Sequence, residues 1–108
     1  MASATRDILL QTERIEEAAS FYEGQLGLIR FMDEPDMIGL EAGGFRLFLD
    51  RAPAYGPVLE ILVDDLEAAK RAVIAAGGTI DQENPAISRC YVTDAFGLTY
   101  NLARRSGA

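Results

Sequence analysis

Apolar and polar positions along the chain repeat one order twice. Residues 7–11 and 58–63 each form a short strand pattern rich in apolar residues. A helix pattern follows each strand, because apolar residues then recur at three- and four-residue steps: Ile15, Ala18, Tyr22 and Leu26 in the first half, Leu66, Ala69, Val73 and Ala76 in the second. Glycines lie at the ends of both stripes, at Gly24 and Gly27 and at Gly77 and Gly78, and we expect them to end the helices.

Each helix pattern precedes three further strand patterns. They cover residues 28–32, 37–41 and 45–50 in the first half, and residues 79–82, 89–93 and 98–103 in the second. A shift of 51 residues places Glu16 on Glu67 and Gly27 on Gly78. We therefore predict a single domain over residues 1–108, built from two repeated βαβββ modules at residues 7–50 and 58–103. Residues 51–57, with two prolines and a glycine, are the predicted connector.

This order predicts an α+β fold. One helix covers only one face of a four-stranded sheet, so the other face needs a different cover, most simply the twin module. We expect the two modules to form a curled mixed sheet around a cleft where a small molecule could bind. The second helix begins in this reading with a capping box formed by Asp64 and Glu67.

Composition and charge narrow the possible functions. The fractions of hydrophobic and charged residues, 49% and 25%, are those of a globular domain. A single cysteine, Cys90, cannot form an internal disulfide, which favours the cytoplasm. We expect no membrane segment, because no apolar run approaches the roughly 20 residues of a span. A net charge of −7 disfavours a nucleic-acid partner, because phosphates are bound by basic surfaces.

The chain contains no histidine. Histidine is the most common metal ligand and the usual general base near neutral pH. A Ser-His-Asp triad and a His-rich zinc site are therefore excluded, and a metal ion would need oxygen ligands.

Three stretches carry a family resemblance. Residues 18–28 read AASFYEGQLGL, residues 60–78 read EILVDDLEAAKRAVIAAGG, and residues 90–102 read CYVTDAFGLTYNL. Together with the repeat they resemble the vicinal oxygen chelate superfamily, which includes glyoxalase I, extradiol dioxygenases, fosfomycin-resistance proteins and bleomycin-resistance proteins. The resemblance implies the two-module fold described above. None of the three stretches is catalytic, so they leave the chemistry open.

The resemblance also implies where a metal ion would bind. Metal-dependent members place a ligand on the first and last strand of each module, and these positions correspond here to Asp7, Phe48, Val58 and Asn101. One carboxylate, one amide and two hydrocarbon side chains cannot hold a catalytic divalent ion, which needs about six oxygen ligands. We therefore expect neither a metal ion nor another cofactor.

Strand alternation predicts which other side chains line the cleft. The candidate ligand-binding residues are Asp7, Gln11, Arg46, Phe48, Glu60, Arg89, Tyr91 and Asn101. Glu60 is a candidate for acid–base catalysis; alternatively it lies on a solvated face or forms a structural ion pair with Arg46 or Arg89. Either arginine could instead bind an anionic group of a ligand. The same alternation turns Cys90 towards the core, and the helix stripe makes Phe21 and Tyr22 core residues. The acidic residues Glu13, Glu16, Glu17 and Glu23 are expected to form a solvated helix face.

Three functions are compatible with these features. The first is a metal-free small-molecule-binding protein similar to the bleomycin-resistance proteins, which sequesters a drug or metabolite; the negative net charge favours a cationic one. The second is a lyase, dioxygenase or isomerase of the same superfamily acting on a small organic substrate. The third is a non-catalytic partner of another polypeptide. A homodimer is expected in all three cases, because twofold pairing is the most common arrangement of oligomers.

Overall fold

The computed structural model describes residues 2–105, and these residues divide into two compact units. Module one spans Arg6–Pro57, and module two comprises the residues from Val58 onward with those up to Thr5. The first half contains β1 (Ser3–Gln11), α1 (Ile15–Leu26), β2 (Ile29–Glu34), β3 (Met37–Glu41) and β4 (Arg46–Asp50). The second contains β5 (Tyr55–Val63), α2 (Leu66–Ala75), β6 (Thr79–Asn84), the 3-10 helix η1 (Pro85–Ile87), β7 (Arg89–Thr93) and β8 (Thr99–Arg104).

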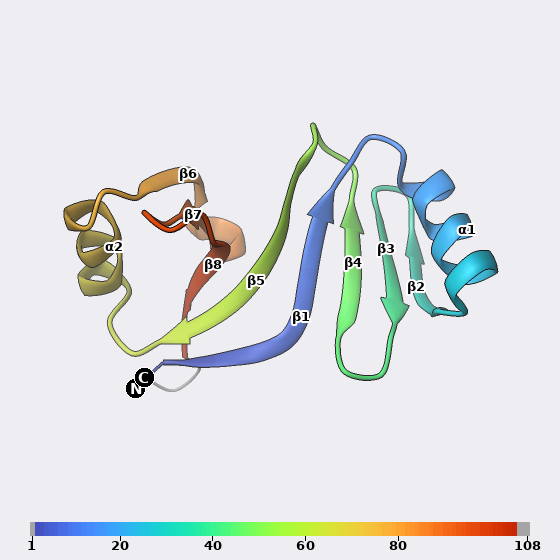
Figure 1. Cartoon of the computed structure of the whole chain (residues 1–108), viewed down its shortest axis with the longest axis horizontal. Coiled ribbons are helices and arrows are strands. Elements are labelled where there is room, and N and C mark those ends of the chain that lie inside the picture. The colour runs from blue at the N-terminus through green and yellow to red at the C-terminus, as the bar shows by residue number, and fades with distance from the viewer. Residues whose placement is uncertain (1, 106–108) are drawn as a thin grey trace. The chain divides into compact units, whose positions relative to one another are not determined.

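The two modules have the same sheet topology (Figure 1). In module one, β1 runs parallel to β4, and β4, β3 and β2 follow as antiparallel neighbours. In module two, β5 runs parallel to β8, and β8, β7 and β6 continue in the same antiparallel order. Each module is therefore a mixed four-stranded sheet with one helix, and the predicted α+β class with repeated βαβββ order is confirmed. That a cleft lies between the modules stays a prediction.

The repeat extends to the register of the strands. Leu9 lies opposite Phe48 in module one, and Glu60 lies opposite Asn101 in module two. Both edge strands also carry an irregularity at the same place, between Arg30 and Met32 in β2 and between Ile80 and Gln82 in β6. Such a bulge inserts one residue into its strand and increases the local twist.

In module one the helix packs on one face of its sheet. Ile15 and Ala19 of α1 are buried against Ile38, Leu40 and Leu49 of β3 and β4. Tyr22 packs against this core, as predicted, but the prediction for Phe21 was wrong, because 53% of this residue is exposed. Each helical residue turns by about 100°, which carries position 21 off the stripe that Ile15, Ala19 and Tyr22 form.

The core of module two is built in the same way. Val73 of α2 packs with Cys90 and Val92 of β7 and Leu102 of β8. Cys90 is 2% exposed, and burial raises the pKa of its thiol. The prediction that Cys90 is an inert core residue agrees with this position, because the thiol rather than the reactive thiolate is favoured there.

Most of the predicted helix ends are confirmed, but Gly24 lies within α1 and does not end it. Gly27 adopts the left-handed conformation with φ 78°, and its N–H donates to the carbonyl of Glu23, which ends α1. At the start of α2, the N-cap is Asp65 and not Asp64, because the Asp65 carboxylate accepts a hydrogen bond from the N–H of Ala68. Asp64 instead pairs with Arg105 at 2.9 Å.

The acidic side chains of α1 are ion-paired rather than only solvated. Arg30 of β2 donates to Glu23 at 2.6 Å and to Glu16 at 3.3 Å, and Glu17 pairs with Arg14. These hydrogen bonds raise the pKa of Arg30. Arg30 thereby links the helix to the edge strand. Glu13, Glu16 and Glu17 are exposed, as expected of a solvated face, whereas Glu23 is half-buried beside Arg30.

The first strand of each half begins earlier than the sequence pattern indicated. β1 begins at Ser3, and β5 begins at Tyr55, so residues 55–57 of the predicted connector lie within a strand. Pro57 lies near the start of β5, where a strand tolerates proline. No helix within residues 2–105 is long and apolar enough to cross a membrane.

Candidate binding faces

Each sheet has a face that its own helix does not cover, and we call it the helix-free face. In module one the alternating residues Ile8, Leu10, Leu47 and Leu49 point into the helix-side core. The residues between them, which include the predicted cleft residues Asp7, Gln11, Arg46 and Phe48, therefore lie on the helix-free face. By the same alternation Glu60, Arg89, Tyr91 and Asn101 lie on the helix-free face of module two, opposite the core residues Ile61, Cys90, Val92 and Leu102. The structure thus places the predicted residues in two groups of four.

Asp7 and Arg46 form a two-pronged ion pair at the centre of the first group. They lie opposite each other in the parallel β1–β4 ladder. The Nε of Arg46 donates to Oδ1 of Asp7 at 2.8 Å, and its Nη2 donates to Oδ2 at 3.0 Å. This hydrogen bonding raises the pKa of Arg46. The two parallel hydrogen bonds to Asp7 fix the plane of the guanidinium, so Arg46 offers a ligand an oriented flat surface.

Two phenylalanine rings lie close to the Arg46 guanidinium. Its carbon lies 5.6 Å from the ring centre of Phe31 and 5.4 Å from that of Phe48. The two rings meet edge to face, with centres 5.6 Å apart and an interplanar angle of 88°. Phe31, Phe48 and Arg46, held by Asp7, form the cluster that we call the aromatic–guanidinium cluster.

Gly39 provides the space for this cluster. A Cβ atom at Gly39 would lie 2.7 Å from Cζ of Phe31, so the ring of Phe31 rests directly over the glycine. Phe31 occupies the bulge of β2, and 46% of it is exposed. Neither residue was predicted from the sequence to belong to the site. An isolated glycine within a strand pattern was the available signal, because it marks a bulge or a close approach.

A second ion pair lies next to the cluster. Arg6 donates to both carboxylate oxygens of Glu41, at 2.6 and 3.0 Å, and to the carbonyl of Gly43. The hydrogen bonds from Arg6 and from the N–H of Gly43 lower the pKa of Glu41 to about 2. Arg46 and Arg6 therefore each have a carboxylate partner, and their positive charges are balanced by Asp7 and Glu41.

In module two, Asn101 has a structural role. Its Oδ1 accepts a hydrogen bond from the N–H of Cys90 at 2.6 Å, and its Nδ2 donates to the carbonyl of Ser88 at 3.1 Å. Asn101 is 8% exposed. Its amide therefore satisfies buried backbone groups where β7 begins, which an apolar side chain could not do.

Glu60 lies opposite Asn101 in the β5–β8 ladder and is half-buried. Within residues 2–105 its carboxylate makes no hydrogen bond or ion pair, so the structural ion-pair alternative is not supported. Arg89 stacks its guanidinium on the ring of Tyr91, 4.6 Å from the ring centre.

The four positions implied for metal ligands do not suit a metal ion. Asp7 is already bound by Arg46, and both polar ends of the Asn101 side chain bind backbone groups. Phe48 and Val58 offer only hydrocarbon. Among the described residues, no three acidic or cysteine side chains gather in a way that could hold a cation.

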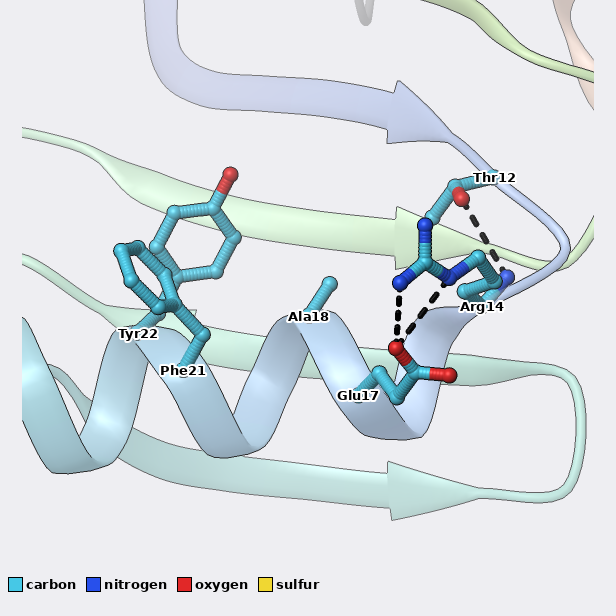
Figure 2. A pocket seen from close by; sticks show the side chains of 6 residues that line it. All are labelled: Thr12, Arg14, Glu17, Ala18, Phe21 and Tyr22. Atoms are coloured by element: carbon cyan, nitrogen blue, oxygen red, sulfur yellow. Dashed lines mark hydrogen bonds and ion pairs between the residues drawn. The ribbon is translucent and has the colours of Figure 1, made fainter.

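A groove of about 370 Å³ lies beside α1, outside the predicted site. Figure 2 shows Arg14 and Glu17 facing each other at one end and Phe21 and Tyr22 at the other. The two rings meet edge to face at 5.5 Å, and the Oγ1 of Thr12 accepts from the N–H of Arg14. Because its two charged side chains neutralise each other, the groove offers mainly apolar contact.

Comparison with known proteins supports the fold. No protein-family model matches the sequence, and no curated protein matches it. A glyoxalase/bleomycin resistance protein/dioxygenase superfamily member from Vibrio splendidus has a TM-score of 0.62 at 17% identity, and the match covers 95% of this chain and 100% of that chain. A hypothetical protein from Bacillus halodurans has a TM-score of 0.61 at 18% identity, covering 99% and 96%. Methylmalonyl-CoA epimerase from Mycobacterium tuberculosis has a TM-score of 0.54 at 18% identity, covering 95% and 88%.

These matches confirm the predicted resemblance at the level of the fold. Solved structures with this fold include the superfamily member and the epimerase named above. A shared fold hosts different chemistries, so the function of this chain has to be argued from its own side chains.

Proposed function

We propose that this protein binds a small organic molecule without a metal ion, and that the helix-free face of module one forms part of the binding surface. The observation that carries the proposal is the aromatic–guanidinium cluster. Phe31 is about half exposed although it packs against Phe48 and Arg46, so apolar and flat polar surface is presented together. Surfaces of this kind orient small ligands by stacking and by a few fixed polar groups.

The charges near the cluster indicate which ligands fit. Arg46 and Arg6 are each neutralised by a carboxylate, so the face does not present an uncompensated cation. The chain as a whole carries a charge of −7, which attracts cationic compounds over a distance. We therefore expect an aromatic ligand that is neutral or cationic. Sequestration of such a drug or metabolite is the function that these features support best.

Calorimetric titration with a panel of cationic glycopeptides and neutral or cationic aromatic metabolites tests the proposal. We expect saturable binding by at least one member, lost in Phe48→Ala and retained in Phe96→Ala. Phe96 is the matched control, because 91% of it is exposed in a turn of module two. Absence of saturable binding, together with metal-dependent turnover, would remove the proposal.

A second candidate function follows from Glu60. A half-buried carboxylate with no hydrogen-bond or ion-pair partner among the described residues is available to take a proton from a substrate. An isomerase would use it to remove a proton from carbon next to a carbonyl and to return it. Exchange of substrate protons with deuterated solvent, lost in Glu60→Gln without loss of binding, would favour this candidate over sequestration.

We also propose that the protein forms a homodimer, as the twofold symmetry of most small oligomers suggests. Sedimentation velocity over a range of concentrations measures this directly. A species of 11.7 kDa at every concentration would contradict the proposal.

A further inference from the structure

The groove beside α1 shares no residue with the aromatic–guanidinium cluster, so its origin and chemistry are considered separately. Positions 14, 18 and 22 follow one another at four-residue steps, so their side chains lie in one row along the helix. The row reads Arg14, Ala18 and Tyr22. In Figure 2, Ala18 lies between the Arg14–Glu17 pair and the rings of Phe21 and Tyr22. The groove is therefore the space that a small side chain leaves between long ones.

The repeat shows that the aromatic wall of the groove is particular to module one. The N-caps of α1 and α2 align the two helices residue by residue. In this alignment Ala72 and Val73 of α2 take the places of Phe21 and Tyr22. An aromatic side chain at position 21 is thus no requirement of the fold, and 53% of Phe21 is exposed. The ring of Phe21 therefore presents apolar surface to the groove.

Two hydroxyl groups of the groove have hydrogens without an acceptor in the part of the chain that the structure describes. The Oγ1 of Thr12 accepts from the N–H of Arg14 at 3.2 Å but donates to no described residue. The hydroxyl of Tyr22, a half-buried residue, forms no hydrogen bond with the described residues. Thr12 is held in place by backbone hydrogen bonds with Asp50 and Ala52. Because Thr12 and Tyr22 lie at opposite ends of the groove in Figure 2, each end offers one hydrogen-bond donor.

The two charged residues of the groove neutralise each other. Arg14 donates to one carboxylate oxygen of Glu17 through Nε at 3.2 Å and also through Nη2. This pairing raises the pKa of Arg14 and lowers the pKa of Glu17, so both groups stay charged at neutral pH. A charged ligand would lose hydration on entering the groove and would meet a pair that is already compensated. The groove therefore favours an uncharged ligand.

We propose that this groove is a second ligand site, and that it binds a small neutral aromatic molecule that carries a hydrogen-bond acceptor at each end of its ring. The ring lies over Ala18 and against Phe21, and the two acceptors bind the hydroxyl groups of Thr12 and Tyr22. The volume lies near the lower end of the range of ligand pockets, roughly 300–1,000 Å³, so a single substituted ring suits it. The proposal does not depend on ligand binding at the aromatic–guanidinium cluster.

Amide N–H correlation spectra of the labelled protein, titrated with 4-hydroxybenzamide, benzamide and 4-hydroxybenzoate, test the inference. We expect 4-hydroxybenzamide to shift the signals of residues 12–22 in a saturable manner at millimolar concentration. Benzamide lacks one polar end and should bind about fivefold more weakly, and the charged 4-hydroxybenzoate should be weakened at least as much. Equal affinity of the three probes, or no saturable shift at these residues, would overturn the proposal.

Two substitutions test whether the probe lies over the alanine. Ala18→Leu fills the groove and should weaken 4-hydroxybenzamide about tenfold or more. Phe21→Ala removes the aromatic wall from an exposed position and should weaken the same probe about fivefold, also if Ala18→Leu fails to fold. Leu26→Ala is the matched control in the same helix, because 60% of Leu26 is exposed and it does not line the groove. Unchanged affinity in either folded variant would place the probe elsewhere and overturn the inference.

A third substitution tests the role of the hydroxyl groups. Tyr22→Phe keeps the ring that packs against the core and removes only the donor. It should abolish the difference in affinity between 4-hydroxybenzamide and benzamide, because one end of the groove then has no donor. A difference that persists in this variant would contradict the proposed orientation of the ligand. Phe48→Ala should leave all three affinities unchanged, which distinguishes this site from the proposed function.

Discussion

Substitution of Gly39 by alanine tests whether the ring of Phe31 belongs to a binding surface. The new Cβ would lie 2.7 Å from Cζ and 3.0 Å from Cε1 of Phe31, and 3.1 Å from Cβ of Met32. The obstacle is the far end of an aromatic side chain that is 46% exposed, so the ring can move outward instead of the backbone. The aromatic–guanidinium cluster would thereby lose Phe31.

The expected change in stability is small because two contributions oppose each other. Loss of the edge-to-face pair between Phe31 and Phe48 costs about 0.5–1.5 kcal/mol. Replacing a glycine within a strand by alanine returns about 0.5–1 kcal/mol. The free energy of unfolding should therefore change by no more than about 1 kcal/mol, while the affinity for a stacked aromatic ligand should fall about tenfold.

Urea unfolding followed by circular dichroism and calorimetric titration with the same ligand measure the two quantities separately. Gly24→Ala is the matched control, because nothing lies within 4 Å of its Cβ and the site is within α1. It should stabilise the protein by about 0.5–1 kcal/mol and leave the affinity unchanged. If Gly39→Ala and Phe31→Ala both bind the ligand as the unsubstituted protein does, the cluster is not part of the binding surface.

Three further predictions concern positions whose surroundings are rigid or charged. Gly78→Ala should destabilise by about 2 kcal/mol, measured by urea unfolding, because its Cβ would lie 2.8 Å from the backbone carbonyl oxygen of Thr93; an unchanged midpoint would contradict this. Glu41 has its pKa lowered to about 2, so the stability it adds is present above its ordinary pKa and is lost as the pH falls towards 2. Thermal melts of Glu41→Gln should therefore lose less stability over that acid range than the unsubstituted protein, and parallel curves would refute the assignment. Asn101→Leu should cost about 1–3 kcal/mol, because two backbone groups lose their partner; the loss should appear as a lower melting temperature, and an equal or higher one would show that water replaces the amide.

The order of the elements was predictable because the periodicity of apolar residues is a local property. The stripe containing Ile15 and Tyr22 and the alternation around Leu47 and Leu49 need no knowledge of distant residues. Alternation along single strands also placed Asp7 and Arg46 on one face, and the parallel pairing of β1 with β4 then brought them into contact.

What could not be predicted depends on packing between strands. The pairing of Arg46 with Asp7 rather than with Glu60 follows from the register of β1 and β4, which no local pattern reveals. Phe31 was overlooked because its face is set by the bulge, where the alternation of side chains is interrupted. The Asn101 side chain looked like a ligand contact, yet it binds the backbone at Cys90.

The paired bulges of β2 and β6 allow the two modules to diverge without rebuilding their sheets. The extra residue is Phe31 in one module and Asp81 in the other, and Asp81 accepts hydrogen bonds from the hydroxyl groups of Thr79 and Thr93. A side chain at such a place is outside the regular ladder, so exchanging it alters the surface chemistry while the strand pairing persists. If the two modules arose by duplication, single replacements at the shared bulge could have given one module an aromatic residue and the other a polar one.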